Sequence, residues 1–324
     1  MKKILRSILP VLALLLLLSH PARSFAGAKN GLLLWFNVIL PTLLPFMLCS
    51  SLLVAWGGVP VLVKPLKPLF SLLTLSEEGS YCLLAGLLCG YPMGAKTAAD
   101  FLREQRISPK EGQLLLAISG CPSPMFLAGF LQTRLPAEIP FFHVVLALYL
   151  PLFLIAAAAK YNSSGSAADP PAGNSPEKIH NKIHEAPFEE ILMNSLEIMV
   201  KIGGFMMIYS ILAAFIEAIP EGILPVMTQS LLLGMIEMTT GIEFISTHLS
   251  GLPAAVLILA SAAFGGLSCL SQVQTVIAFN REKNAGLSIR HYVRWKLIHA
   301  SLACAILILL SSLQQQLRPL PLPR

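Results

Sequence analysis

The chain alternates between long apolar stretches and short polar segments. Apolar runs long enough to cross a bilayer recur from near the N-terminus to residue 313, and a spanning helix needs roughly 20 mostly apolar residues. The polar segments between these runs are short, apart from one near the middle of the chain. The pattern predicts an all-α integral membrane protein with about eight transmembrane helices.

The same pattern divides the chain into five regions. The first region is hydrophobic and follows a basic start; it is either a signal peptide with a cleavage site at Ser24-Phe25-Ala26 or a retained first span or signal anchor, and we favour retention. Two membrane regions are separated by a linker rich in Ser, Gly, Asn and Pro, and a Pro-rich tail ends the chain. The predicted bounds are 1–24 for the hydrophobic segment, 31–160 and 188–313 for the membrane regions, 161–187 for the linker and 314–324 for the tail.

Three of the apolar stretches are interrupted by glycine and proline. Such residues free backbone groups that lipid cannot hydrogen-bond, so a break is tolerated only where it is buried in protein or lines a wet cavity. Secondary transporters build solute sites from discontinuous helices of this kind. The predicted helix-break residues are Gly90, Pro92 and Gly94 in the first stretch, Gly120 and Pro122 in the second, and Gly265 and Gly266 in the third.

The two membrane regions show weak similarity to each other. Without gaps, Lys96-Thr97 aligns with Gln274-Thr275, and at a second offset Phe46-Met47 aligns with Phe205-Met206. Broken segments at corresponding places of two halves point to a site at the midplane. We therefore predict two repeats, parallel if the basic segments after both breaks are cytoplasmic and inverted if only the second one, Arg281–Lys296, is.

The charge content excludes a soluble enzyme. Only 12% of residues are charged, against about 25% in soluble domains. The net charge of +6 comes from basic residues in short loops beside apolar runs, which fits the positive-inside bias and contact with anionic lipid better than nucleic acid. Membrane lipid is thus an expected partner and nucleic acid is not.

Familiar catalytic and metal motifs are absent from the sequence. There is no GxxxxGK[ST], HExxH or GxSxG stretch, so we expect neither an enzyme nor a cofactor. The cysteines form no CxxC pair, which predicts small packing residues rather than a disulfide framework or a metal site. A metal path using Cys89 and Cys121, which adjoin the breaks, is a weaker alternative.

Ionisable residues within the spans are the first candidates for function, because they are costly in a membrane. Lys96 and Asp100 are four residues apart, as are Glu197 and Lys201, so each pair shares a helix face. Glu237 has no basic residue within a turn and could accept a proton or cation or hydrogen-bond a solute. The competing interpretation is that the pairs are structural and neutralise each other.

Neutral polar residues beside the breaks complete the candidate pathway. Such groups suit an uncharged polar solute, although they also join helices in any polytopic protein. They are Tyr91, Ser119, Ser123, Gln272 and Gln274.

Several motifs together resemble a known family. They are Gly31-Leu32-Leu33-Leu34-Trp35, Pro41-Thr42-Leu43-Leu44-Pro45-Phe46, Gly90-Tyr91-Pro92-Met93-Gly94-Ala95-Lys96, Ser119-Gly120 and the Gly234–Gly241 stretch around Glu237. They are similar to the YlbJ family of sporulation integral membrane proteins, which carry nucleoside-recognition Gate domains. The chain departs from that pattern at Cys121-Pro122-Ser123-Pro124, where relatives more often have Asn or Ser before Gly-Pro.

The resemblance implies two Gate-like repeats with broken helices and a role in spore cortex formation. We expect a transporter or permease-like component of the cell (inner) membrane that acts on a small polar solute. The alternative is a non-transporting scaffold that binds other sporulation membrane proteins.

Overall fold

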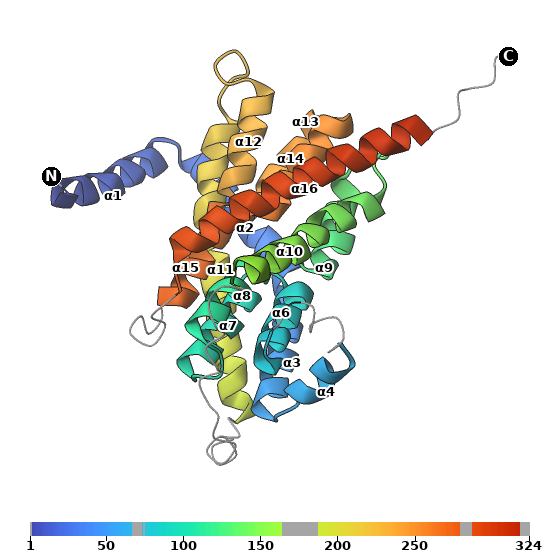
Figure 1. The fold of residues 1–324 in the computed structure, drawn as a ribbon. Helices are drawn as coiled ribbons and strands as arrows, with labels where there is room; N and C mark the ends of the chain where they lie inside the picture. Colours follow the sequence, from blue (N-terminus) through green and yellow to red (C-terminus); the bar gives the residue numbers. More distant parts are fainter. Residues whose placement is uncertain (1, 67–72, 74, 164–186, 279–286, 318–324) are drawn as a thin grey trace.

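The computed structural model describes residues 2–66, 73, 75–163, 187–278 and 287–317, and every regular element in these ranges is helical (Figure 1). The elements of the first half are α1 (Lys2–Ser19), α2 (Pro21–Leu34), η1 (Trp35–Ile39), α3 (Leu40–Ala55), α4 (Val59–Val63), η2 (Lys64–Leu66), α6 (Glu77–Cys89), α7 (Met93–Arg103), α8 (Pro109–Ile118), α9 (Pro124–Phe126), η3 (Leu127–Leu131), η4 (Gln132–Arg134) and α10 (Phe141–Ser163). Those of the second half are α11 (Phe188–Glu217), α12 (Val226–Ile236), α13 (Met238–His248), α14 (Gly251–Phe264), α15 (Gly266–Ala278) and α16 (Ile289–Leu317).

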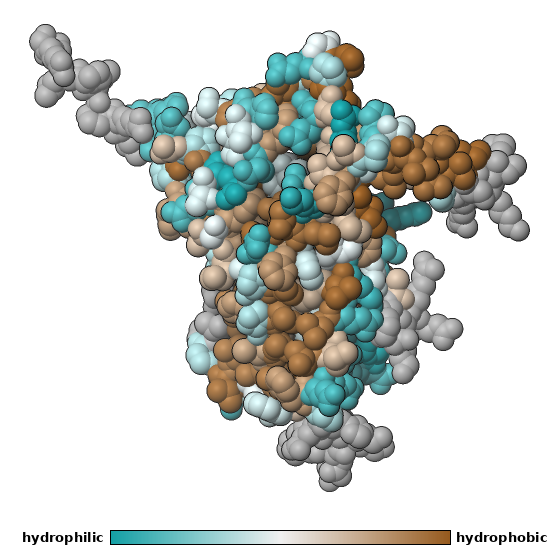
Figure 2. Space-filling view, turned by 180° about the vertical axis from the view of Figure 1, so that it is seen from behind, coloured by the Kyte–Doolittle hydropathy of each residue, from teal (hydrophilic) through white to brown (hydrophobic). Residues whose placement is uncertain are grey.

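Five of the described helices are long and apolar enough to cross a membrane. They are Pro21–Ala55, Phe141–Ala158, Phe188–Glu217, Gly251–Ala278 and Ile289–Gln316. The space-filling view shows apolar side chains spread over much of one face of the molecule, as a lipid-facing surface requires (Figure 2). The protein is thus a helical, multi-pass membrane protein, and the number of eight spans expected from the sequence is not confirmed.

The first long helix contains a π-helical turn. In a regular helix the ring of Pro41 would clash with the carbonyl of Asn37, four residues earlier. The turn η1 contains Asn37 and widens the helix at that place. Residues 21–55 therefore form one continuous helical rod in spite of Pro41 and Pro45.

This rod packs closely against α11, and the two run in opposite directions (Figure 1). A Cβ atom on Gly27 would lie 2.8 Å from Ile211 Cα, and one on Gly31 would lie 2.8 Å from Ser210 Cβ. Farther along, Gly203 adjoins the ring of Trp35. Small residues spaced four apart let helix backbones approach in membranes, which explains why glycine occupies this seam.

The two halves of the described chain share part of their element order, although the two repeats expected from the sequence are not confirmed. In each half a long helix is followed by two broken helices and a second long helix: α2–α3, α6/α7, α8/α9 and α10, then α11, α12/α13, α14/α15 and α16. The match of Phe46-Met47 with Phe205-Met206 follows this order, since it joins α3 to α11. The match of Lys96-Thr97 with Gln274-Thr275 does not, since it joins α7 to α15, whose counterparts in this order are α13 and α9.

One break was not predicted. The sequence pattern favours a single span over 222–245, but the structure ends α12 at Ile236 and begins α13 at Met238. Glu237 has extended backbone there and accepts hydrogen bonds from the start of α13. Apolar residues continue on both sides of Glu237, so a hydropathy profile shows no interruption at this helix break.

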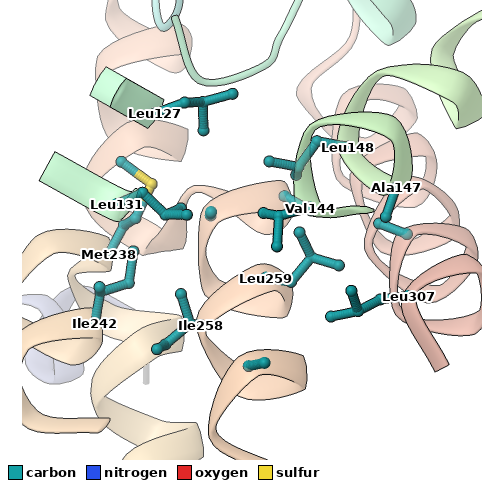
Figure 3. Close-up of a cluster of buried hydrophobic side chains, with 14 of the residues drawn as sticks. Leu127, Leu131, Val144, Ala147, Leu148, Met238, Ile242, Ile258, Leu259 and Leu307 are labelled. Atoms are coloured by element: carbon teal, nitrogen blue, oxygen red, sulfur yellow. The ribbon is translucent and has the colours of Figure 1, made fainter. Parts of the chain in front are cut away.

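The largest buried cluster holds the broken helices of both halves together. It draws on η3, α10, α13, α14 and α16 (Figure 3). Its members labelled in the figure are Leu127, Leu131, Val144, Ala147, Leu148, Met238, Ile242, Ile258, Leu259 and Leu307. Because both halves contribute to one core, neither half buries its apolar faces alone.

Some predicted regions lie outside the described residues. These are most of the linker 161–187, the basic residues Arg281 and Lys283, and the end of the tail beyond Leu317. The candidate cleavage site Ser24-Phe25-Ala26 lies within α2.

Candidate functional site

The four helix breaks meet at one place. A Cβ on Gly86 would lie 2.2 Å from the Ser119 carbonyl oxygen, so the first broken helix touches the second. A Cβ on Gly265 would lie 3.3 Å from Cζ of Tyr91, and one on Gly266 would lie 3.2 Å from the Ile236 carbonyl oxygen. The fourth break therefore touches both the first and the third.

Two of the breaks depend on left-handed glycines. Gly90 ends α6 with φ +78°, and Gly265 ends α14 with φ +85°. Side chains other than glycine rarely adopt this conformation. The same glycines leave room for close neighbours, because a Cβ on Gly90 would lie 2.8 Å from the Ser123 amide nitrogen.

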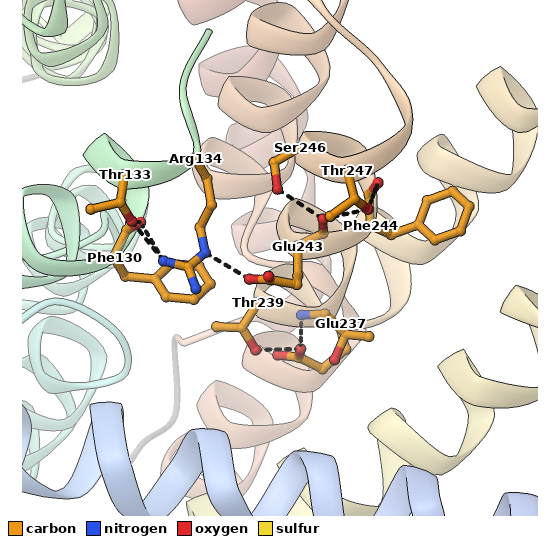
Figure 4. A network of polar contacts seen from close by, with 10 residues as sticks. Phe130, Thr133, Arg134, Glu237, Thr239, Glu243, Phe244, Ser246 and Thr247 are labelled. Atoms are coloured by element: carbon orange, nitrogen blue, oxygen red, sulfur yellow. Dashed lines mark hydrogen bonds and ion pairs between the residues drawn. The ribbon is translucent and has the colours of Figure 1, made fainter. Parts of the chain in front are cut away.

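Polar side chains satisfy the helix starts at the other breaks. Ser123 Oγ accepts a hydrogen bond from the Phe126 amide at 3.2 Å. Glu237 Oε2 accepts from the Thr240 amide at 2.7 Å and from the Thr239 hydroxyl at 2.5 Å (Figure 4). These contacts cap the first turns of α9 and α13, whose amides have no partner within their own helices.

A small cavity of about 50 Å³ lies at the junction of the breaks, and we call it the inner chamber. Its size is that of one or two water molecules. It is lined by Ile39, Thr42, Leu43, Cys89, Gly90, Tyr91, Pro122, Ser123, Phe126, Ile202, Met206, Glu237, Met238, Thr239, Cys269 and Gln272.

A larger cavity of about 400 Å³ lies between α3, α7, α11 and α15, and we call it the outer cavity. Its polar and charged lining residues are Ser50, Ser51, Lys96, Thr97, Asp100, Arg103, Glu104, Asn194, Ser195, Glu197, Lys201, Gln272 and Thr275. Gln272 and Ile202 line both cavities. The two spaces are therefore neighbours, with Gln272 as a polar group between them.

Both predicted ion pairs line the outer cavity. Lys96 Nζ lies 2.8 Å from Asp100 Oδ2, and Arg103 contacts the other oxygen of Asp100 at 2.9 Å. Lys201 Nζ lies 2.5 Å from Glu197 Oε1. All of these side chains are partly exposed.

Glu237 lies in the inner chamber, away from both pairs. It is buried, and both of its hydrogen bonds go to Oε2. Within the described part of the chain no hydrogen bond reaches Oε1. Glu237 thus caps the first turn of α13 through Oε2 and also lines the chamber.

The remaining candidates are placed differently from one another. Tyr91, Ser123 and Gln272 line the inner chamber. Ser119 is fully buried between the first and second breaks, and its Oγ has no partner among the described residues. Gln274 is exposed and is not a lining residue of either cavity.

Sequence reasoning missed the most deeply buried cation. The basic pattern of Arg281–Lys296 predicts a cytoplasmic Lys296, but the structure buries this side chain completely on α16, next to Tyr91 and Gly120. His299, one turn later, is buried as well. The available signal was a Lys and a His three residues apart at the start of an apolar span.

The cysteines divide between the chamber and the packing around it. Cys89 and Cys269 line the inner chamber, whereas the Cys121 thiol donates to the Gly86 carbonyl at 3.7 Å. No group of three or more His, Cys, Asp or Glu side chains that could hold a metal occurs in the described residues.

The chain is similar to the sporulation integral membrane protein YlbJ of Bacillus subtilis (strain 168). The two are 27% identical over 304 residues, which covers 81% of this chain and 72% of that protein. The similarity supports the family resemblance carried by the motifs around Tyr91 and Glu237. No protein-family model matches the chain, and no solved structure matches it.

Proposed function

We propose, from the similarity to the sporulation integral membrane protein YlbJ, that the chain is a transporter or permease-like component acting in the cell membrane during sporulation. A small polar solute enters the outer cavity and passes the inner chamber, where the four broken helices meet.

The observation that carries the proposal is the pair of adjoining cavities. In a chain with several helices apolar enough to cross a membrane, a 400 Å³ space lined by charged and hydroxyl side chains has room for a small molecule. A second, smaller space lies next to it at the helix breaks. Irregular backbone at membrane depth is expected where it is buried or lines such a cavity.

The charges of the outer cavity favour a polar solute. Its basic residues are Lys96, Arg103 and Lys201, and its acidic residues are Asp100, Glu104 and Glu197. Both the acidic and the basic side chains can turn toward a solute, because the ion pairs are partly exposed and therefore weak.

The repeated element order supports an alternating mechanism. The rod α2–α3 and its counterpart α11 run in opposite directions, as equivalent helices do in inverted repeats. In such proteins one repeat moves against the other around a fixed central site. Here that site is the inner chamber.

Spore formation by charge-neutral variants tests the role of the outer cavity. In a Bacillus subtilis strain lacking YlbJ, the chain carrying both Lys96→Met and Asp100→Leu should give on the order of 100-fold fewer heat-resistant spores than the unsubstituted chain, since the cavity loses two of its charged lining residues. The matched control removes an ion pair that lines neither cavity, by Arg134→Met with Glu243→Leu. A strain carrying this control variant should form nearly as many heat-resistant spores as a strain carrying the unsubstituted chain, provided that both proteins reach the same level in the membrane.

Thiol labelling tests the path directly. In a variant without native cysteines, Thr275→Cys in the outer cavity and Thr239→Cys in the inner chamber should react with a membrane-impermeant reagent. Val200→Cys, on the exposed apolar side of α11, is the lipid-facing control. The transport proposal would be refuted if the Lys96/Asp100 variant sporulated fully and neither cavity position were labelled. The scaffold interpretation would then remain.

A further inference from the structure

Lys296 is a buried basic residue with no carboxylate partner. Its side chain is fully enclosed, and none of its contacts in the described part of the chain is to Asp or Glu. A charge at such a place is costly unless every donor is satisfied. Because burying this group is costly, we infer that Lys296 has a role that an apolar side chain of the same length could not fill.

The hydrogen bonds of Lys296 match an ammonium group. Such a group has three N–H donors and no acceptor. Lys296 Nζ donates to the Tyr91 hydroxyl, to the Gly120 carbonyl at 2.8 Å and to His299 Nδ1 at 3.1 Å. Each donor therefore has one acceptor.

The acceptors are themselves fixed in direction. The Tyr91 hydroxyl donates onward to the Ala263 carbonyl at 2.9 Å, which leaves its lone pairs to accept from Lys296. His299 Nε2 lies 2.8 Å from the Leu148 carbonyl, so its proton is on Nε2 and Nδ1 accepts. One orientation of every polar group satisfies the whole network.

This network ties α16 to the breaks. Tyr91 lies in the first break, Gly120 in the second, and Ala263 two residues before the fourth, at Gly265. The Lys296 ammonium also lies 4.7 Å from the centre of the Tyr91 ring, and that ring lines the inner chamber. A displacement of Lys296 therefore moves a wall of the chamber.

We propose that Lys296 is the positioning residue of the inner chamber: a tethered cation that holds three of the four helix breaks together, so that the chamber stays closed toward α16. The hydrogen bonds that hold Lys296 in place are all made to groups of the protein and involve no solute. The inference extends the proposed function, because it names the residue that keeps the pathway closed at its inner end.

Labelling of Cys269 in the purified full-length chain tests this role. Cys269 lines the chamber and serves as the reporter once the other five cysteines are replaced by alanine. With Lys296→Met the rate of reaction with a small methanethiosulfonate should rise roughly tenfold or more, since three acceptors lose their donor. An unchanged rate would overturn the proposal.

A destabilised variant elsewhere on α16 separates positioning from general stability. Leu307 is buried in the core cluster about three turns from Lys296. Leu307→Ala should lower the thermal midpoint without raising the labelling rate of Cys269. An equal rise in both variants would reduce Lys296 to an ordinary stabilising residue.

Two further measurements keep the test decisive if Lys296→Met does not accumulate. Tyr91→Phe keeps the ring but removes the link to Lys296 and Ala263, and should raise the labelling rate by a smaller factor. In Lys296→Ala, propylammonium chloride should lower the rate again, whereas sodium chloride should not. No rise with Tyr91→Phe and no rescue by the amine would refute the positioning role.

None of these readouts requires transport. The positioning role of Lys296 can therefore fail while the proposed function stands, and the proposed function can fail while the positioning role stands.

Discussion

The outer cavity and the junction of the breaks hold charge in opposite ways. In the outer cavity, acids and bases sit one helical turn apart and pair with each other: Lys201 is 43% exposed and Glu197 is 61% exposed. At the junction, Lys296 and Glu237 are 0% and 3% exposed, and each is hydrogen-bonded to uncharged groups of the broken helices.

This difference separates charges that can exchange partners from charges that fix structure. An exposed pair gains little from its partner because water competes for both groups. A buried charge is held by every hydrogen bond that it makes, since losing one leaves an unsatisfied group in a medium of low dielectric. We therefore expect substitutions at the junction to cost stability and substitutions in the outer cavity to cost function.

The largest loss of stability is expected where the first two breaks touch. A Cβ on Gly86 would lie 2.2 Å from the Ser119 carbonyl oxygen and 2.7 Å from its Cβ. Gly86→Ala should therefore push the broken helices apart and cost about 3 kcal/mol. Thermal unfolding in detergent, followed by far-UV circular dichroism, measures the loss.

The matched control is a glycine in open space. Gly204 lies in the middle of α11, and a Cβ atom placed on it would meet no described neighbour within 4 Å. Gly204→Ala should be neutral or stabilise by about 0.5–1 kcal/mol, because alanine is the better helix former. Equal losses at both positions would show that the junction is no more tightly packed than the periphery.

A smaller loss is expected when the cap of α13 is removed. Glu237→Ala leaves the Thr240 amide and the Thr239 hydroxyl without their acceptor, which should cost about 1–2 kcal/mol. Glu237→Gln keeps one acceptor oxygen and should retain at least half of that stability. Glu197→Ala in the outer cavity is the comparison, and a loss there as large as that of Glu237→Ala would contradict the distinction between the two regions.

The sequence predicted the breaks that contain glycine or proline but not the one at Glu237. Gly90-Tyr91-Pro92 and Gly265-Gly266 carry their conformational signal in their own residue types. At Glu237 the signal is the acceptor of a helix cap, which becomes visible only when Thr239 and Thr240 are seen to start a new helix. A hydropathy profile averages over a window of residues and therefore does not detect such a cap.

Pairing of charged side chains could be predicted where the partner is local in sequence. Spacing of four residues was enough to pair Lys96 with Asp100 and Glu197 with Lys201. The site of Lys296 could not be predicted in this way because two of its three partners lie far away in sequence: Tyr91 is separated from it by 205 positions and Gly120 by 176. Contacts of that range depend on how α16 crosses the breaks, which no local pattern encodes.

The ion pair between the halves should have an intermediate effect. Arg134 Nε donates to Glu243 Oε2 at 2.7 Å, and its guanidinium lies 3.9 Å from the centre of the Phe130 ring (Figure 4). Both interactions reach solvent, so Arg134→Ala should cost about 1 kcal/mol. Arg134→Lys should lose part of this, because lysine lacks the planar guanidinium. A stability change in Arg134→Ala that does not shrink at high salt would show that packing on Phe130, and not charge, links the halves.

The smallest effect on stability is expected in the outer cavity itself. A double-mutant cycle over Glu197→Gln and Lys201→Met should give a coupling of about 0.3–0.5 kcal/mol, as for other exposed pairs one turn apart. Raising the sodium chloride concentration from 0.05 to 0.5 M, which shortens the Debye length to roughly 4 Å, should remove most of it. Spore formation should nevertheless fall in the double variant, because the lining of the cavity loses both charges. A coupling above about 1.5 kcal/mol that persists at high salt would place this pair with the buried charges of the junction, and the outer cavity would then be a rigid structural element instead of a space that a solute can enter.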